Sequence, residues 1–201
     1  MSIIETWKLI ENFSNLVRVS GSEDERRAAK YIIDRLRDLR IPVKVYEPVL
    51  YLSIPLSASL EVIRPFKEKI RCKTLSFSAS TTVEGEVVYI PSVHPKTTEE
   101  VLGKYESIRV VGEQDLEGKI VLTEGLSIQP GMFRAFEDRG AIAQINIHPG
   151  ERIHEGIITP IWGTPTIENL RDKPKTPIVS VNKFGGEYLK ERLVGGPITV
   201  R

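Results

Sequence analysis

The chain has 201 residues, of which 40% are hydrophobic and 27% are charged, as is ordinary for a soluble globular protein. Its 28 basic and 27 acidic residues leave a formal net charge of +1, which excludes the strong basic field of a nucleic-acid-binding protein. The single cysteine, Cys72, excludes both an internal disulfide framework and a zinc site built on several cysteines, and we expect it to be a small hydrophobe in or near the core.

Membrane and export signals are missing from the sequence as printed. No stretch reaches the roughly 18 consecutive apolar residues of a membrane span. The first residues are amphipathic and carry Glu5 and Glu11, unlike a signal peptide. We therefore expect a cytoplasmic protein with no nucleic-acid partner and no membrane partner.

Two helices are predicted in the first 40 residues. Apolar residues recur at steps of three and four between residues 2 and 18, which is helical spacing. Ser22 and Glu25 form the S-x-x-E pattern of a capping box, so a second helix should begin near Glu23. Pro42 ends this helical pattern, and the alternation in VKVYEP, residues 43–48, predicts a strand.

From about residue 50 the sequence changes to short β runs bounded by Gly and Pro. A hairpin is predicted from SASLEVIRP and KEKIRCKTL, and single strands from GEVVYIP, SIRVVG, GKIVLTEG, AIAQINI, PIVSVN and PITVR. AIAQINI is so apolar that we expect it to be buried on both faces. Helices are predicted over TTEEVLGKY, over Pro130 to Arg139 with Gly140 at the end, and over GGEYLKERLV.

The pattern as a whole predicts a mixed α/β fold in two parts. Residues 1–48 form a helical lead-in, and residues 49–201 form a β-dominated domain.

A metal site has weak candidates in this sequence. A zinc site needs about three convergent protein ligands. His148 and His154 are close in sequence, with Glu151 and Glu155 beside them. The string HPGERIHEG is not the helical H-E-x-x-H arrangement, because Pro149 and Gly150 disfavour a helix there. We weigh a flexible metal site at these histidines against two ordinary loop histidines, and favour the second.

Motifs for nucleophilic catalysis and for phosphate binding are absent. The sequence contains no G-x-S-x-G elbow, no G-x-G-x-x-G loop and no Walker loop. We therefore expect no catalytic residue in this chain.

The segment from Ile153 to Thr166 is long and rich in proline for a connector. We expect Trp162 to pin this loop to the core, since a large aromatic brings much apolar area to one contact. The loop is also the expected docking surface for another domain or chain. The candidate contact residues are Trp162, His154, Glu155, Pro160 and Pro165.

Five stretches carry a resemblance to a known family: SGSEDERRAAKYIIDRLRDLRIPVKVYEP, DLEGKIVLTEG, FRAFEDRGAIAQINI, HEGIITPIWGTPT and TPIVSVNKFGGEYLKERL. In order and spacing the chain resembles the N-terminal part of zinc aminopeptidases with an inserted protease-associated domain, relatives of glutamate carboxypeptidase II and the transferrin receptor ectodomain. The runs DLEGKIV and RGAIA are the most typical of protease-associated domains.

The resemblance implies a swivelling β/β/α protease-associated domain, preceded by two helices and a strand of the peptidase domain. It also implies that the zinc ligands come after the inserted domain, typically beginning with H-x-D. No H-x-D occurs here, so none of the family's catalytic or metal residues carries over, and we expect no cofactor in this chain. Arg40 stands where the family commonly has Gly, so the turn before Pro42 is expected to close differently.

Three functional hypotheses follow. The first is a non-catalytic accessory domain that acts in substrate access or protein–protein interaction, with a peptidase catalytic domain or a separate chain as partner. Aminopeptidase activity would then need a catalytic portion that is missing here. The second is a stand-alone binding module that self-associates through the apolar stripe of its N-terminal helices. The third, least favoured, is an enzyme that assembles a site from scattered acids and His148 or His154.

Overall fold

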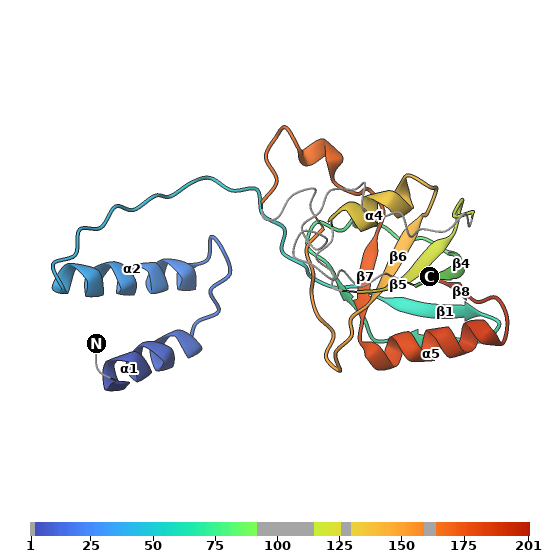
Figure 1. The fold of residues 1–201 in the computed structure, drawn as a ribbon, viewed down its shortest axis with the longest axis horizontal. Helices are drawn as coiled ribbons and strands as arrows, with labels where there is room; N and C mark the ends of the chain where they lie inside the picture. The colour runs from blue at the N-terminus through green and yellow to red at the C-terminus, as the bar shows by residue number, and fades with distance from the viewer. Residues whose placement is uncertain (1–2, 92–114, 126–129, 159–163) are drawn as a thin grey trace. The chain divides into compact units, whose positions relative to one another are not determined.

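The computed structural model describes residues 3–91, 115–125, 130–158 and 164–201 (Figure 1). The chain divides into two units, Met1–Leu52 and Ser53–Arg201. The assignment of residues 1–48 to a peptidase-type domain and of 49–201 to a protease-associated domain stays a prediction.

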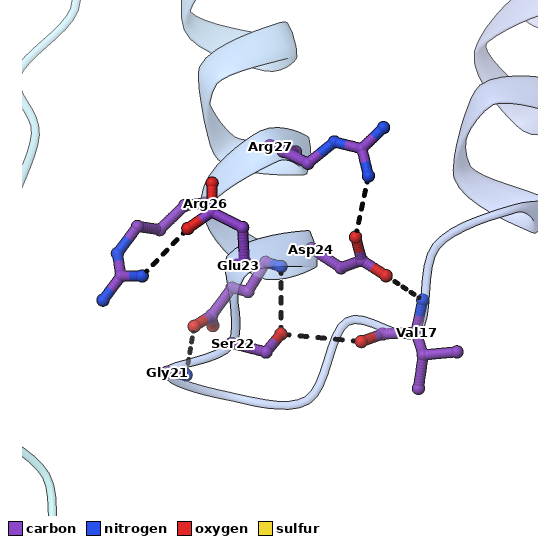
Figure 2. A network of polar contacts seen from close by, with 8 residues as sticks. Val17, Gly21, Ser22, Glu23, Asp24, Arg26 and Arg27 are labelled. Atoms are coloured by element: carbon purple, nitrogen blue, oxygen red, sulfur yellow. Dashed lines mark hydrogen bonds and ion pairs between the residues drawn. The ribbon is translucent and has the colours of Figure 1, made fainter.

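The first unit contains two helices, α1 (Ile3–Ser14) and α2 (Glu23–Asp38). Ser22 is the N-cap of α2, and its Oγ accepts a hydrogen bond from the N–H of Glu25 at 3.1 Å (Figure 2). The Glu25 carboxylate in turn accepts from the N–H of Gly21, and the Asp24 carboxylate accepts from the N–H of Val17 at 3.0 Å. These bonds satisfy backbone donors at and before the helix start, so the predicted N-terminus of α2 is confirmed.

The strand predicted at residues 43–48 is not formed. Residues 41–59 carry no strand, and no strand occurs among the described residues of Met1–Leu52. A strand is held by backbone hydrogen bonds to a neighbouring strand, and an alternating sequence does not supply that neighbour.

The end of α2 corrects the expectation for Arg40. Its φ is 56°, in the left-handed region. The N–H of Ile41 donates to the carbonyl of Leu36 at 2.9 Å, and the N–H of Arg40 donates to that of Arg37 at 2.8 Å, which is the Schellman pattern. The turn therefore closes as it would with glycine, and the arginine Cβ makes this conformation cost about 1 kcal/mol.

The second unit is built on one sheet. Its strands are β1 (Leu60–Arg64), β2 (Glu68–Ile70), β3 (Lys73–Thr74), β4 (Gly85–Ile90), β5 (Ile120–Glu124), β6 (Ala143–Ile147), β7 (Ile178–Val181) and β8 (Thr199–Val200). Their order is β2-β1-β8-β4-β5-β6-β7-β3. β4 to β7 are parallel to one another, and the other pairings are antiparallel. Every residue of β6 is buried, as its apolar sequence predicted.

Helices cover both faces of the parallel strands. α4 (Pro130–Glu137) and α5 (Lys183–Val194) lie on opposite sides of the sheet (Figure 1). Phe133 of α4 joins the core that contains Val121, and Leu189 of α5 joins the core that contains Leu122 and Ile147. A 3-10 turn, η2, spans Leu170–Asp172. Among the described helices, none is long and apolar enough to cross a membrane.

The chain itself draws the two edges of the sheet together. β1 and β2 form the predicted hairpin, with Leu60 opposite Ile70. The same run then continues into β3, which pairs with β7 at the other edge of the sheet. Only Arg71 and Cys72 separate the two edge strands, and the three Cα steps from Ile70 to Lys73 reach at most about 11 Å. The sheet must therefore curl.

The predicted mixed α/β class is confirmed, and a curled eight-stranded sheet with helices fits the expected β/β/α arrangement. The predicted helix from Pro130 is also confirmed, and Gly140 follows it with a φ of 88°. The strand predicted in SIRVVG and the helix predicted in TTEEVLGKY lie outside the described residues.

Gly186 lets α5 approach β6 closely. Asn182 caps α5, with its Oδ1 accepting from the N–H of Gly185 at 3.0 Å, so both glycines of the Gly185–Gly186 pair lie in the first turn. A Cβ on Gly186 would lie 2.3 Å from Cγ2 of Ile147, closer than real Cβ contacts come. Only a residue without a side chain fits here.

We expect Arg40→Gly to stabilise the end of α2 by about 1 kcal/mol, because it removes the left-handed strain. Amide hydrogen exchange in the last turn of α2 measures this. Arg37→Gly, inside the same helix, should instead destabilise it by about 1 kcal/mol. Equal effects of the two substitutions would contradict the argument.

We expect Gly186→Ala to lower the free energy of unfolding by about 1–3 kcal/mol, because the new methyl group overlaps Ile147. Urea unfolding measures the change. Gly195→Ala is the matched control, because Gly195 has a φ of −78° and a Cβ there would come no closer than 3.4 Å to its nearest neighbour. If both variants lose the same stability, the close approach is not the cause.

Candidate functional site

Two of the predicted candidate residues come together at the carboxyl end of β6. His148 directly follows the last residue of that strand, and its ring stacks on that of His154 with 5.0 Å between ring centroids. In parallel sheets the carboxyl ends of neighbouring strands share one edge, where binding residues commonly gather. We call residues 148–158 the histidine loop.

The histidine loop is anchored on one side to the turn between β7 and α5. The bonds run from His148 N–H to the Val181 carbonyl at 2.9 Å, from Lys183 N–H to the Gly150 carbonyl at 3.0 Å, and from Asn182 Nδ2 to the Glu151 carbonyl at 2.6 Å. Asn182 thus caps α5 and holds the loop at the same time. The position of the loop therefore follows from the start of that helix.

The other side of the loop is tied to the chain around β3. The N–H of Ser76 donates to the Gly156 carbonyl at 3.0 Å, and the N–H of Ile158 donates to the Ser76 carbonyl at 2.9 Å. Lys73 and Glu155 form an ion pair at 2.6 Å, with each side chain about half exposed. Such an exposed pair contributes little to stability, roughly 0–1 kcal/mol, so the backbone bonds hold this side.

His148 is held as a neutral ring. The N–H of Gly150 donates to its Nδ1 at 3.0 Å, so the neutral ring carries its proton on Nε2. Burial first, and then the charge that His154 can carry, lower the pKa of His148 below its ordinary value, although a backbone hydrogen bond with Arg152 opposes the shift. At neutral pH the loop therefore presents an uncharged imidazole.

This geometry bears on the metal site weighed for the two histidines. With Nδ1 occupied by Gly150 and the proton on Nε2, the His148 ring has no free lone pair for a metal. Across the described ranges, no group of three or more His, Cys, Asp or Glu side chains could hold a metal ion. Metal binding by His148 and His154 stays a prediction, and it would require His148 to release Gly150.

The predicted contact residues are placed as follows. His154 and Glu155 are exposed, and Pro165 is buried. Trp162 and Pro160 lie outside the described residues. His154 and Glu155 are therefore the two predicted contact residues that the structure shows at the surface.

A row of buried polar residues was not foreseen. Thr123 of β5, Asn146 of β6 and Ser180 of β7 are partners in register across the three strands, and all are fully buried. Asn146 donates from Nδ2 to the carbonyl of Gly125 at 3.1 Å. Each of these residues interrupts an apolar strand sequence near its end, and this interruption is the sequence feature that could have drawn attention to them. Their alignment across three strands depends on the strand register, which the sequence does not show.

Two side-chain oxygens of this polar row, Oγ1 of Thr123 and Oγ of Ser180, have no hydrogen-bond partner in the described structure. A buried unsatisfied polar group costs about 1–3 kcal/mol, and buried waters commonly meet such groups. No histidine or charged side chain belongs to the row, so it lacks a nucleophile–base pair.

On the other face of β4 and β5, a second polar cluster links the sheet to α5. The hydroxyl of Tyr89 donates to Oε1 of Glu124 at 2.8 Å, and the ammonium of Lys190 also contacts Glu124. Burial, followed by this bond and the Glu124 charge, raises the pKa of Tyr89 to about 12. The tyrosine stays protonated and serves as a hydrogen-bond donor, so the cluster is structural.

Solved structures with the same fold are known aminopeptidases and a related peptidase. This chain is similar to an aminopeptidase from Aneurinibacillus sp. strain AM-1, with a TM-score of 0.65 and 22% identity over 99% of this chain and 43% of that one. It is similar to a Peptidase M28 precursor from Shewanella amazonensis SB2B, with a TM-score of 0.67 and 15% identity over 96% of this chain and 45% of that one. A zinc aminopeptidase from Bacillus subtilis gives a TM-score of 0.54 and 18% identity over 96% of this chain and 41% of that one.

At identities this low, the likeness shows a shared peptidase-like fold. The chain spans less than half the length of each of these three proteins. No protein-family model matches the chain, and no curated protein matches its sequence.

We expect stability to fall in mild acid through His148. The pKa of His148 is lower in the folded protein than in the unfolded chain, where it is about 6.5. The contribution of the neutral ring to stability is therefore fully present above pH 6.5. It is lost as the pH falls through the pKa of the folded state, because the unfolded chain then binds the proton more readily. His148→Asn keeps an acceptor near the position of Nδ1 and does not titrate. Urea unfolding at about pH 7.5 and about pH 5 should show a smaller acid loss in this variant.

The control for this measurement is His148→Ala, which removes the acceptor and should weaken the protection of the Gly150 amide at both pH values. An acid loss in His148→Asn equal to that of the unaltered protein would assign the effect to other groups.

Proposed function

We propose that this chain is a non-catalytic accessory part of a zinc aminopeptidase of the glutamate carboxypeptidase II and transferrin receptor type. In this proposal residues 49–201 form a protease-associated domain, and residues 1–48 are a piece of the peptidase domain. The likeness in fold to two aminopeptidases and an M28 peptidase supports it, as does the short span of the chain relative to them.

The first unit carries the main observation behind the proposal. Ala28 is the one buried hydrophobic residue among the described residues of Met1–Leu52. Ile3 is 88% exposed, Trp7 61% and Ile10 50%, although all three belong to the apolar stripe of α1. Two helices that bury so little apolar area do not make a core of their own. Their apolar stripe is suited to packing against further peptidase structure.

The proposed partner is therefore a peptidase catalytic portion, in the same polypeptide or in a separate chain. That portion would hold the zinc, and this chain would hold no cofactor. The accessory domain would act in substrate access or in protein contacts, through the histidine loop with His154 and Glu155 and the segment that contains Pro160, Trp162 and Pro165. We propose a cytoplasmic location.

A second candidate function rests on the same exposed stripe. If no catalytic portion covers α1, two copies of this chain can bury the stripe against each other, and the protein is then a self-associating binding module. Self-association in the purified chain distinguishes this candidate from the first.

We expect the purified chain to hydrolyse no aminoacyl p-nitroanilide, with or without added zinc, because no complete catalytic site is proposed in it. A zinc aminopeptidase assayed in parallel shows that the conditions permit turnover. Zinc-dependent turnover that follows the protein through purification and stops with a chelator would overturn the accessory role.

Light scattering completes this experiment. The accessory proposal expects a monomer, and the self-association candidate expects a dimer that Trp7→Ala dissociates while Lys8→Ala, at the next exposed residue of α1, does not.

A further inference from the structure

The curled sheet leaves an open cavity at the edge opposite the histidine loop. Its volume is about 560 Å³, and its lining includes Ile120, Ala143 and Ile178, the first residues of β5, β6 and β7. Two stretches of chain also contribute to the lining, residues 54–59 before β1 and residues 80–83 before β4. Every lining residue belongs to Ser53–Arg201.

The backbone of the two stretches is unpaired. Within the described part of the chain, no residue of 54–59 or of 80–83 gives or receives a backbone hydrogen bond. Neither stretch contains a turn or a bend, so both run extended beside the cavity. Apart from Pro55, every one of these residues offers both a main-chain donor and an acceptor. Unpaired extended backbone of this kind is a template for an added strand.

The side chains around the cavity indicate what kind of strand fits. The lining mixes hydroxyl groups of Ser and Thr with apolar side chains such as Leu60 and Val83. Its one charged residue is Arg201, which is already paired with Glu61 at 3.1 Å and with Glu84 at 3.6 Å. A charged ligand would therefore meet no unpaired charge of opposite sign in the lining.

A buried polar group at the same cavity also lacks a partner. Gln144 lines the cavity and is only 1% exposed. Its Nε2 donates to the carbonyl of Phe133 at 2.7 Å, whereas its Oε1 has no hydrogen-bond partner in the described structure. An acceptor left in this state costs about 1–3 kcal/mol, and because Oε1 is shielded from solvent, a peptide N–H would reach it only after the Gln144 side chain moves.

From these observations we propose that the cavity binds an extended, uncharged peptide segment, which adds as a strand beside residues 54–59 or 80–83. At about 3.3 Å per residue, residues 54–59 span about 20 Å and residues 80–83 about 13 Å, so a peptide of four to six residues fits these lengths. The main-chain pairing gives affinity without a fixed sequence, and the uncharged lining selects against charged side chains.

This site deepens the proposed role in protein contacts, but its evidence is independent of the peptidase partner. Binding to the cavity is measured with the chain alone and without zinc. If the chain proved to be an enzyme, the proposed accessory role would be wrong. The peptide site would be unaffected by that result, because only the binding experiment tests it.

The experiment uses the full chain and the probe acetyl-Thr-Val-Ala-Val-Thr-amide. We expect the probe to slow amide hydrogen exchange in residues 54–59 or 80–83 by about tenfold or more, because a paired N–H exchanges through opening. The matched control is the same peptide N-methylated at both valines and at the alanine, which keeps the side chains and removes main-chain donors from both edges of the strand. It should give no protection, and replacing both threonines by lysine should weaken binding.

Two variants test the location. Ala79→Trp fills the cavity, and Ser80→Pro removes a main-chain donor with a smaller change in volume. Ala79→Trp should abolish protection by the probe in either stretch, and Ser80→Pro should abolish it if the protected residues are 80–83, whereas Ala29→Trp, on the exposed surface of α2, should do neither. Thermal melts show whether each variant folds; if Ala79→Trp does not fold, Ser80→Pro tests pairing at residues 80–83, and its counterpart Ser57→Pro tests pairing at residues 54–59.

Three results would overturn the proposal: no protection at millimolar probe, equal protection by the N-methylated peptide, or protection in the protein alone that disappears on dilution. The last result would mean that a second copy of the chain fills the cavity.

Discussion

The architecture of the second unit depends on one short connection. Arg71 and Cys72 are all that separates β2 from β3, although these strands lie at opposite edges of an eight-stranded sheet. A two-residue link between edges is compatible only with a curled sheet. One of the two buried clusters, the one that contains Leu122 and Ile147, lies inside the curl. The open cavity lies at the edge of the sheet where β5, β6 and β7 begin. Burial raises the pKa of Cys72 to about 11, so this thiol stays protonated and behaves as the small hydrophobe expected of it.

The two units differ in how much of their apolar surface they bury within themselves. The second unit has two buried clusters, one on each face of the parallel strands, and these hold α4 and α5 in place. The first unit relies on caps and ion pairs at the surface, together with the edge-on contact of Phe13 and Tyr31 at 5.8 Å. Surface pairs of this kind are weak compared with apolar burial. This imbalance is the physical basis for expecting a partner at the helices.

Two titratable side chains at the sheet, those of His148 and Tyr89, are held in their uncharged forms. His148 is kept uncharged by burial and by the Gly150 N–H, and Tyr89 is kept protonated beside Glu124. The buried row is made of hydroxyl and amide groups. Acid–base catalysis needs a group that exchanges protons near the working pH and faces a reacting atom. His148 and Tyr89 instead take part in hydrogen bonds within the fold, with the Gly150 N–H and with Glu124.

The amino-acid sequence alone determined the local features: the start of α2 at Ser22, the buried strand β6, the helices α4 and α5 and the α/β class. Each depends on neighbours within a few residues, through capping, periodicity or composition. Only the tertiary structure decided the rest. Whether 43–48 forms a strand depends on a partner strand, the row of Thr123, Asn146 and Ser180 depends on register, and the cavity depends on the closure of the sheet. These features require residues far apart in sequence to meet, and local patterns do not contain that information.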